Sequence, residues 1–192
     1  MNKIIINPFE KFTEVQLFAL GIALTIGGSL LGFLFSARFD GVLDLHVAPG
    51  VTLAQPFIDN AINTVSLFLL LFIVGIIINK KTRFIDVFNT VLIARSPFYL
   101  LTLGNISGFM NGIENKINPN DPLDINFSPT DILVLGVFSM FAVGFLVWFV
   151  ALLYNGFKTA TNLKSTPHKI AFGFTIILAE VLSKALIGFL NY

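Results

Sequence analysis

Five long apolar stretches dominate the pattern of hydrophobic and polar residues along this chain. They cover residues 15–35, 57–78, 84–103, 129–154 and 167–190, and polar connections separate them. About 20 mostly apolar residues in a helix cross a hydrocarbon core of about 30 Å, so each stretch can span a membrane. The sequence therefore predicts an all-α fold, a polytopic integral membrane bundle of five transmembrane helices, with residues 1–192 forming a single transmembrane domain.

Composition supports a membrane protein and excludes several other classes. Only 12% of the residues are charged and 55% are hydrophobic, whereas a soluble domain carries about 25% charged residues. The net charge of +1 offers no basic surface for nucleic acid, so we expect no nucleic-acid partner. The chain has no cysteine, which excludes disulfides and cysteine-based zinc sites.

Basic residues gather on one side of the predicted topology. The connections after the second and fourth spans carry Lys80, Lys81, Arg83, Lys158, Lys164 and Lys169. Basic loops stay in the cytoplasm under the positive-inside rule. We therefore expect a protein of the bacterial inner membrane with a cytoplasmic N-terminus and a C-terminus outside. These cytoplasmic basic loops would meet anionic lipid headgroups or a partner protein.

The third span carries a charge and a helix breaker near its middle, at Arg95, Ser96 and Pro97. Proline lacks a backbone N–H, so we expect a helix kink at Ser96 and Pro97, with the Ser96 hydroxyl available to a freed backbone group. A charge at this depth is costly and marks either a pairing site or a functional site. Arg95 is therefore the first candidate site residue.

Glu180 and Lys184, in the last span, are the predicted partners of Arg95. Arg95 lies nine residues beyond Asp86 and Glu180 lies eleven beyond Lys169, which places both about 14–16 Å from the same membrane face. We predict an intramembrane charge network of Arg95, Glu180 and Lys184. It either locks the third and fifth spans together, or serves an ion or proton relay or a polar groove for a lipid headgroup.

A polar face opens the second span. Asn60, Asn63 and Thr64 share one side of a helix because they are three and four residues apart. Two interpretations stay open for this polar face. The side chains either form hydrogen bonds inside the bundle or line a path for a substrate.

Gly28 and Gly32 form a G-x-x-x-G pattern in the first span. Small residues at this spacing let two helices approach closely. The neighbouring helix belongs either to this chain or to a second copy, so internal packing and a homo-oligomer both remain open.

Two polar stretches flank the first span. Residues 1–14 form a short amphipathic lead that either lies at the headgroup level or is a partly ordered tail. Residues 36–56 are expected to form a solvated loop or an interfacial segment. Asp44 and His46 in this loop match no zinc motif and lack a third ligand, so we expect no metal and no cofactor.

Three short tracts resemble the prokaryotic Yip1-domain family. They are Asn7-Pro8-x-x-x-Phe12, the third span over residues 84–99 with its aspartate and mid-span proline, and residues 148–171. The resemblance implies a five-helix membrane protein with a cytoplasmic N-terminus. Eukaryotic relatives act in vesicle traffic and bind small GTPases, but this chain lacks their D-L-Y-G-P signature. GTPase binding is therefore not expected here.

The sequence favours a non-enzymatic function. No G-x-S-x-G, H-E-x-x-H or Walker motif occurs. We expect an integral membrane protein of Yip1-like type that organises lipids or partner proteins, with membrane lipids, a membrane-protein partner or a second copy as its partners. The alternative is a small transporter or channel subunit with a polar path past Arg95 and Glu180.

Overall fold

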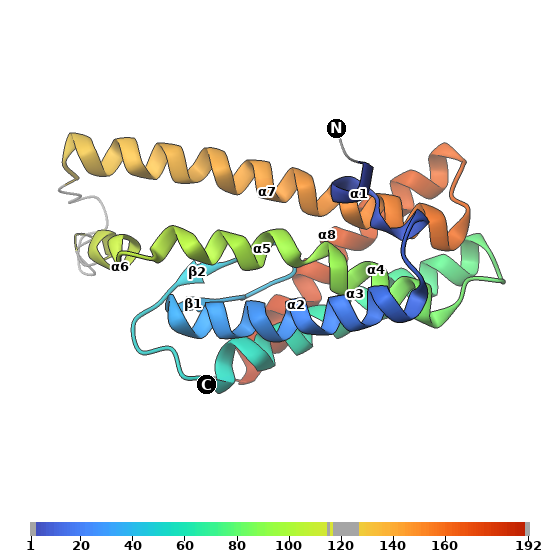
Figure 1. The fold of residues 1–192 in the computed structure, drawn as a ribbon, viewed down its shortest axis with the longest axis horizontal. Helices are drawn as coiled ribbons and strands as arrows, with labels where there is room; N and C mark the ends of the chain where they lie inside the picture. Colours follow the sequence, from blue (N-terminus) through green and yellow to red (C-terminus); the bar gives the residue numbers. More distant parts are fainter. Residues whose placement is uncertain (1–2, 115, 117–126, 191–192) are drawn as a thin grey trace.

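The computed structural model describes residues 3–114, 116 and 127–190, so the predicted position of the C-terminal Tyr192 lies outside the described residues. Its helical elements are α1 (Lys3–Ile6), η1 (Pro8–Glu10), α2 (Glu14–Leu34), α3 (Ala54–Ile78), α4 (Phe84–Ala94), α5 (Ser96–Leu101), η2 (Thr102–Asn105), α6 (Phe109–Glu114), α7 (Pro129–Thr161) and α8 (Thr166–Leu190). Five helical segments are long and apolar enough to cross a membrane. The predicted all-α bundle is therefore confirmed (Figure 1).

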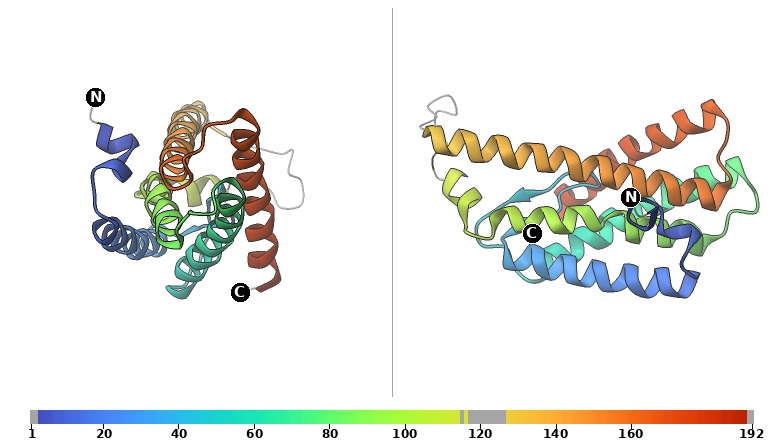
Figure 2. Two further views of the ribbon diagram at one scale, coloured as in Figure 1. Left: turned by 90° about the vertical axis from the view of Figure 1, so that its right-hand side faces the viewer. Right: turned by 45° about the horizontal axis from the view of Figure 1, so that its top comes forward.

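The broken helix α4–α5 lies at the centre of the bundle. Helix α4 packs against α2, α3 and α7, and the end-on view of Figure 2 shows it between them. In an apolar stretch of 18 residues within the segment 84–105, 67% of the residues are buried, whereas only 6% are buried in such a stretch of α7. Helix α8 packs mainly against α3. The third predicted span is thus the core of the protein, and much of α7 faces outward.

Both ends of the bundle have a distinct character. We call the end that holds the start of α2 and the connections α3–α4 and α7–α8 the basic end, because these connections carry the predicted basic loops. Lys80, Lys81 and Arg83 are exposed there, as are Lys158, Lys164 and Lys169. The opposite end holds the start of α3 and the start of α7.

Capping side chains begin two of the long helices. Thr13 and Gln16 form a capping box at α2, and Ser128 and Asp131 form one at α7. Helix α7 continues to Thr161, past the predicted end of the fourth span at residue 154. The hydroxyls of Thr159 and Thr161 donate to carbonyls one turn earlier in the same helix, and the Asn155 amide donates to the carbonyl of Ile6.

The third span is interrupted at Arg95. Helix α4 ends at Ala94 and α5 begins at Ser96, with Pro97 in its first turn. The Ser96 hydroxyl donates to the carbonyl of Ile93 at 2.9 Å. A freed carbonyl near the break is therefore bonded within the helix itself.

Residues 37–47, in the segment between α2 and α3, turn back into the bundle, so the expectation of a solvated loop is wrong for this part. Within it, two strands of two residues each, β1 (Ala37–Arg38) and β2 (His46–Val47), pair in an antiparallel hairpin. Figure 1 shows this hairpin running back above α2 toward the middle of the molecule. Ala37, Phe39 and Val42 are fully buried. We call residues 37–47 the re-entrant segment.

The glycines of α2 serve packing within this chain. A Cβ on Gly28 would lie 2.1 Å from the Tyr99 ring, and one on Gly32 would lie 2.9 Å from the ring of Phe39. Both glycines therefore sit against neighbouring elements of the same protein. The structure favours internal packing over the homo-oligomer interpretation of the G-x-x-x-G pattern.

The N-terminal lead is attached to α7. The indole Nε1 of Trp148 donates to the carbonyl of Ile5 at 2.8 Å, and the Asn155 amide donates to the carbonyl of Ile6 at 3.1 Å. Elements α1 and η1 therefore lie along α7 near the basic end (Figure 1). Ile5 remains 57% exposed, so the lead keeps an outward apolar surface.

Candidate functional site

Arg95 lies at the helix break with its side chain fully buried. Its Nη1 donates to the carbonyl oxygen of Val42 at 3.3 Å, and its Nη2 donates to Oδ1 of Asn60 at 3.0 Å. The Asn60 amide in turn donates to the Ser29 hydroxyl at 2.9 Å. The guanidinium is thus bonded to the re-entrant segment and to α3.

Glu180 binds the same peptide group from the other side. The N–H of Leu43 donates to Glu180 Oε2 at 2.6 Å. The carbonyl of Val42 and the N–H of Leu43 belong to one peptide unit, and in a trans peptide these two groups point in opposite directions. The dipole of this unit therefore lies between cation and carboxylate in the favourable orientation.

This geometry differs from the expected direct pairing. Among the described residues, Arg95 and Glu180 form no ion pair within 4.0 Å, and one peptide unit connects them instead. The Nζ of Lys184 lies 3.5 Å from Oε1 of Glu180 but only 2.6 Å from Oδ2 of Asp44 in the re-entrant segment. Each of the three predicted network residues therefore contacts residues 42–44.

Further polar side chains of α3 and α8 bond the same backbone. Asp59 accepts from the N–H of Phe39 at 3.3 Å, and Asn63 donates to the Phe39 carbonyl at 2.6 Å. Ser183 accepts from the N–H of Val42 at 3.2 Å. Thr64 is buried beside these groups in the same helix. The predicted polar face of α3 therefore points into the bundle, where Asn63 bonds the re-entrant segment and Asn60 bonds Arg95 and Ser29.

Sequence reasoning missed the ion pair between Arg38 and Asp59. Arg38 Nε lies 2.6 Å from the fully buried Asp59 carboxylate. One signal was available, because an arginine follows the first span and an aspartate opens the second. Irregular backbone at this depth requires polar partners inside the protein. The buried polar residues of this bundle supply those partners, so their role is structural.

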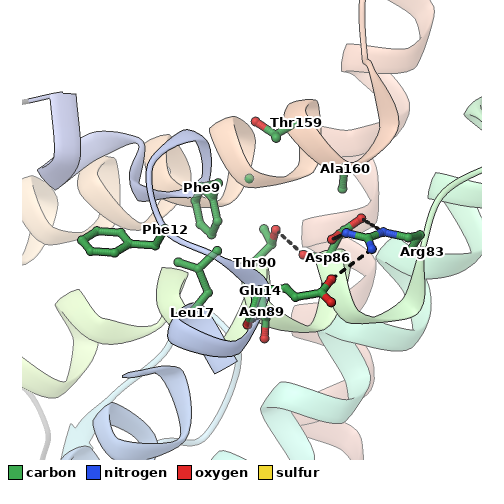
Figure 3. Close-up of a pocket in the computed structure, with 11 residues that line it drawn as sticks. Phe9, Phe12, Glu14, Leu17, Arg83, Asp86, Asn89, Thr90, Thr159 and Ala160 are labelled. Atoms are coloured by element: carbon green, nitrogen blue, oxygen red, sulfur yellow. Dashed lines mark hydrogen bonds and ion pairs between the residues drawn. The ribbon is translucent and has the colours of Figure 1, made fainter. Parts of the chain in front are cut away.

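A polar cavity of about 510 Å³ opens at the basic end, between η1 and the ends of α2, α4 and α7. Figure 3 shows its charged side: Arg83 lies between the carboxylates of Glu14 and Asp86, while Phe9 and Phe12 lie on the other side. We call this space the interface cavity. It contains three of the charged groups that the sequence places at the basic end.

The charges in the interface cavity leave a surplus of negative charge. Arg83 bonds Asp86 through Nε at 2.8 Å and Nη2 at 2.7 Å, and its Nη1 lies 3.0 Å from Glu14. The hydrogen bond to Asp86 raises the pKa of Arg83 above its ordinary value. One permanent cation thus faces two carboxylates, and all three of its donor nitrogens are occupied.

The uncharged polar groups of the interface cavity also present acceptors. The Asn89 amide donates to the carbonyl of Glu14 at 2.9 Å, while its Oδ1 is buried and bonds no described protein atom. The Thr90 hydroxyl donates to the carbonyl of Asp86 at 2.7 Å, so its oxygen lone pairs stay available. This cavity is therefore suited to a hydrogen-bond donor that carries positive charge.

A second polar cavity, of about 330 Å³, shares Thr159 with the first. Lys158, Lys164 and Glu10 are the charged residues of its lining, so cations are in excess. We call it the basic cavity. Two of the predicted basic loop residues therefore line a cavity at this end.

An apolar groove of about 590 Å³ lies between α2 and α5, with Trp148 of α7 at its edge. Gly27 and Leu31 of α2 and Leu100 of α5 are among its lining residues. The groove lies along helical segments of membrane-spanning length and hydropathy. It is a recess of the size that small ligands occupy in proteins.

Comparison of the chain with models of known protein families, with curated proteins and with solved structures finds no match in any of the three. The resemblance to the Yip1-domain family therefore stays a prediction from the sequence.

Proposed function

We propose that this protein is a non-enzymatic integral membrane protein of Yip1-like type that binds and organises membrane lipids. One observation carries the proposal: polar cavities lie at the basic end, where helices reach the headgroup level, and an apolar groove lies along the spans. A phospholipid has this same division into a charged headgroup and apolar chains. The groove would take an acyl chain and the cavities would take headgroup atoms.

The exposed basic residues bear on how the protein is oriented in the membrane. The exposed lysines of the basic end would face the cytoplasm of a bacterial cell under the positive-inside rule. Anionic lipids of the cytoplasmic leaflet attract such residues. Membrane lipids are therefore the partners that this surface favours.

The alternative of a transporter or channel has weaker support. A path past Arg95 would need a polar cavity that reaches it, and Arg95 is fully buried. Neither Arg95 nor Glu180 lines any of the three cavities described above. Their bonds go to the peptide unit of Val42 and Leu43. We propose that this charge network is structural rather than conductive.

Lipid retention tests the proposal. Native mass spectrometry of the detergent-purified protein should show bound phospholipid. Gly27→Leu fills the groove and should reduce that retention, because Gly27 lines it and faces open space. Gly173→Leu is the matched control, since Gly173 also faces open space but lies on α8 away from the groove. Equal lipid retention in both variants would refute the groove.

Flux measurements test the alternative. Liposomes that contain the protein should conduct small ions no faster than empty liposomes. Flux in the wild type that disappears in Arg95→Leu would overturn the structural interpretation of the charge network and favour a transporter.

A further inference from the structure

We propose that the interface cavity binds the ammonium group of a zwitterionic phospholipid headgroup, and that the adjoining basic cavity binds the phosphate of the same headgroup. This inference rests on the proposed function, and it names the lipid class that the site selects. A primary amine, as in an ethanolamine headgroup, fits the described groups best.

The charge balance of the interface cavity favours a cation. Glu14 and Asp86 both face Arg83, so the three side chains carry one surplus negative charge. An ammonium group placed there compensates this surplus. A phosphate placed there would meet two carboxylates, and three of the five N–H groups of Arg83 are already directed at them.

The hydrogen-bonding groups favour the same occupant. A primary ammonium carries three donors and no acceptor. The cavity presents the carboxylate oxygens of Glu14 and Asp86 and the Thr90 hydroxyl oxygen, which keeps its lone pairs because the hydroxyl donates to the Asp86 carbonyl. These groups are acceptors, so they match the donors of an ammonium group.

The aromatic side of the cavity is compatible with a cation. Phe9 and Phe12 line it opposite the charged residues (Figure 3). The face of an aromatic ring attracts a cation that lies within about 6 Å of its centre. The cavity thus combines carboxylates with aromatic rings, as ammonium sites do.

The basic cavity provides the complementary charge next to it. Lys158 and Lys164 outnumber Glu10 in its lining, and Thr159 lines both cavities. A zwitterionic headgroup carries a phosphate and an ammonium a few bonds apart. Neighbouring cavities of opposite charge therefore match one such headgroup, whereas a glycerol headgroup has no cation for the interface cavity.

Headgroup selectivity tests this inference. The full-length protein in detergent is mixed with equal amounts of ethanolamine, choline and glycerol phospholipids of one chain length, and bound lipid is read by native mass spectrometry. We expect the ethanolamine lipid to bind about tenfold more tightly than the glycerol lipid. Asp86→Asn should remove most of this preference, and Glu14→Gln with Asp86→Asn should reverse it.

Matched controls separate headgroup recognition from general effects of charge. Asp44→Asn makes the same change at an exposed carboxylate of the re-entrant segment and should leave the preference intact. Lys158→Gln should weaken both lipids, whereas Lys80→Gln, at an exposed lysine that lines neither cavity, should not. Free ethanolamine that competes as well as the lipid would assign the site to soluble amines instead.

The outcomes distinguish this inference from the proposed function. Bound phospholipid without headgroup preference, or a preference unchanged in Asp86→Asn, overturns the ammonium site and leaves lipid binding standing. Absence of any bound phospholipid in the wild type overturns both.

Discussion

Replacing Gly28 with alanine tests the close packing of α2 against the central helix. The added Cβ would lie 2.1 Å from Cγ of Tyr99 and 2.3 Å from its Cδ1. Non-bonded carbon atoms sit about 3.5–4.0 Å apart, so helix and ring would have to separate by about 1.5 Å. Tyr99 has little freedom to move, because it is 2% exposed and packs edge-on against Phe39.

The magnitude follows from two opposing effects. Overpacking of this kind costs about 1–3 kcal/mol. Alanine also favours the helix over glycine by about 1 kcal/mol. Gly27→Ala is the matched control for Gly28→Ala, because Gly27 is the preceding residue of the same helix and its Cβ would meet no atom within 4 Å. The helix-propensity gain is common to both variants, so their difference isolates the contact with Tyr99.

Thermal unfolding in detergent, followed by the loss of monodisperse protein, measures the difference. A change of 1 kcal/mol shifts Tm by about 2–4 °C in a chain of this length, so Gly28→Ala should unfold about 2–12 °C below Gly27→Ala. Equal Tm values for the two variants would show that Gly28 does not pack against Tyr99, and the internal use of the G-x-x-x-G pattern would be refuted.

Three further predictions concern the re-entrant segment and a helix start. Gly41→Ala places a Cβ 2.5 Å from the Glu180 carboxylate oxygens, so it should lower Tm in the wild type. It should lower Tm much less in a Glu180→Ala background, and a double-mutant cycle measures this difference. Hydrogen bonding to Asp40 raises the pKa of His46 above 6.5. The pair of His46 and Asp40 therefore stabilises the folded protein fully below pH 6.5, and this stabilisation is lost as pH rises through the elevated pKa. The Tm difference between wild type and His46→Gln should shrink from pH 5.5 to 8.5. A constant difference would contradict this prediction. Ser128→Ala removes the cap of α7 and should cost about 1 kcal/mol in the same unfolding assay, whereas an unchanged Tm would show that the cap adds no stability.

Local features of the chain were readable before the structure. The five apolar stretches became five long apolar helices, because the preference of about 20 residues for lipid over water depends on their own composition. Ser128 caps α7 through a residue only three positions away. The helix break at Arg95 likewise follows from the adjacent Pro97.

The sequence predicted only in part which polar groups would bond each other inside the bundle. Counting residues from the membrane face placed Arg95 and Glu180 at similar depth, but it could not show that a peptide unit of the re-entrant segment lies between them. That segment resembles a loop in composition, and polar groups of α3, α8 and the α4–α5 break bond its backbone. Asp59, Asn63 and Ser183 bond its backbone from positions that no local pattern connects.

The sequence by itself determined which segments are apolar helices, where two of them begin or break, and which connections carry basic charge. Those properties come from short-range chemistry: hydropathy, capping and the missing N–H of proline. Only the tertiary structure decided that the first connection turns inward and that Glu14, Arg83 and Thr159 border one polar cavity. Such contacts join residues far apart in the chain, and they exist only after helix packing has chosen which faces meet.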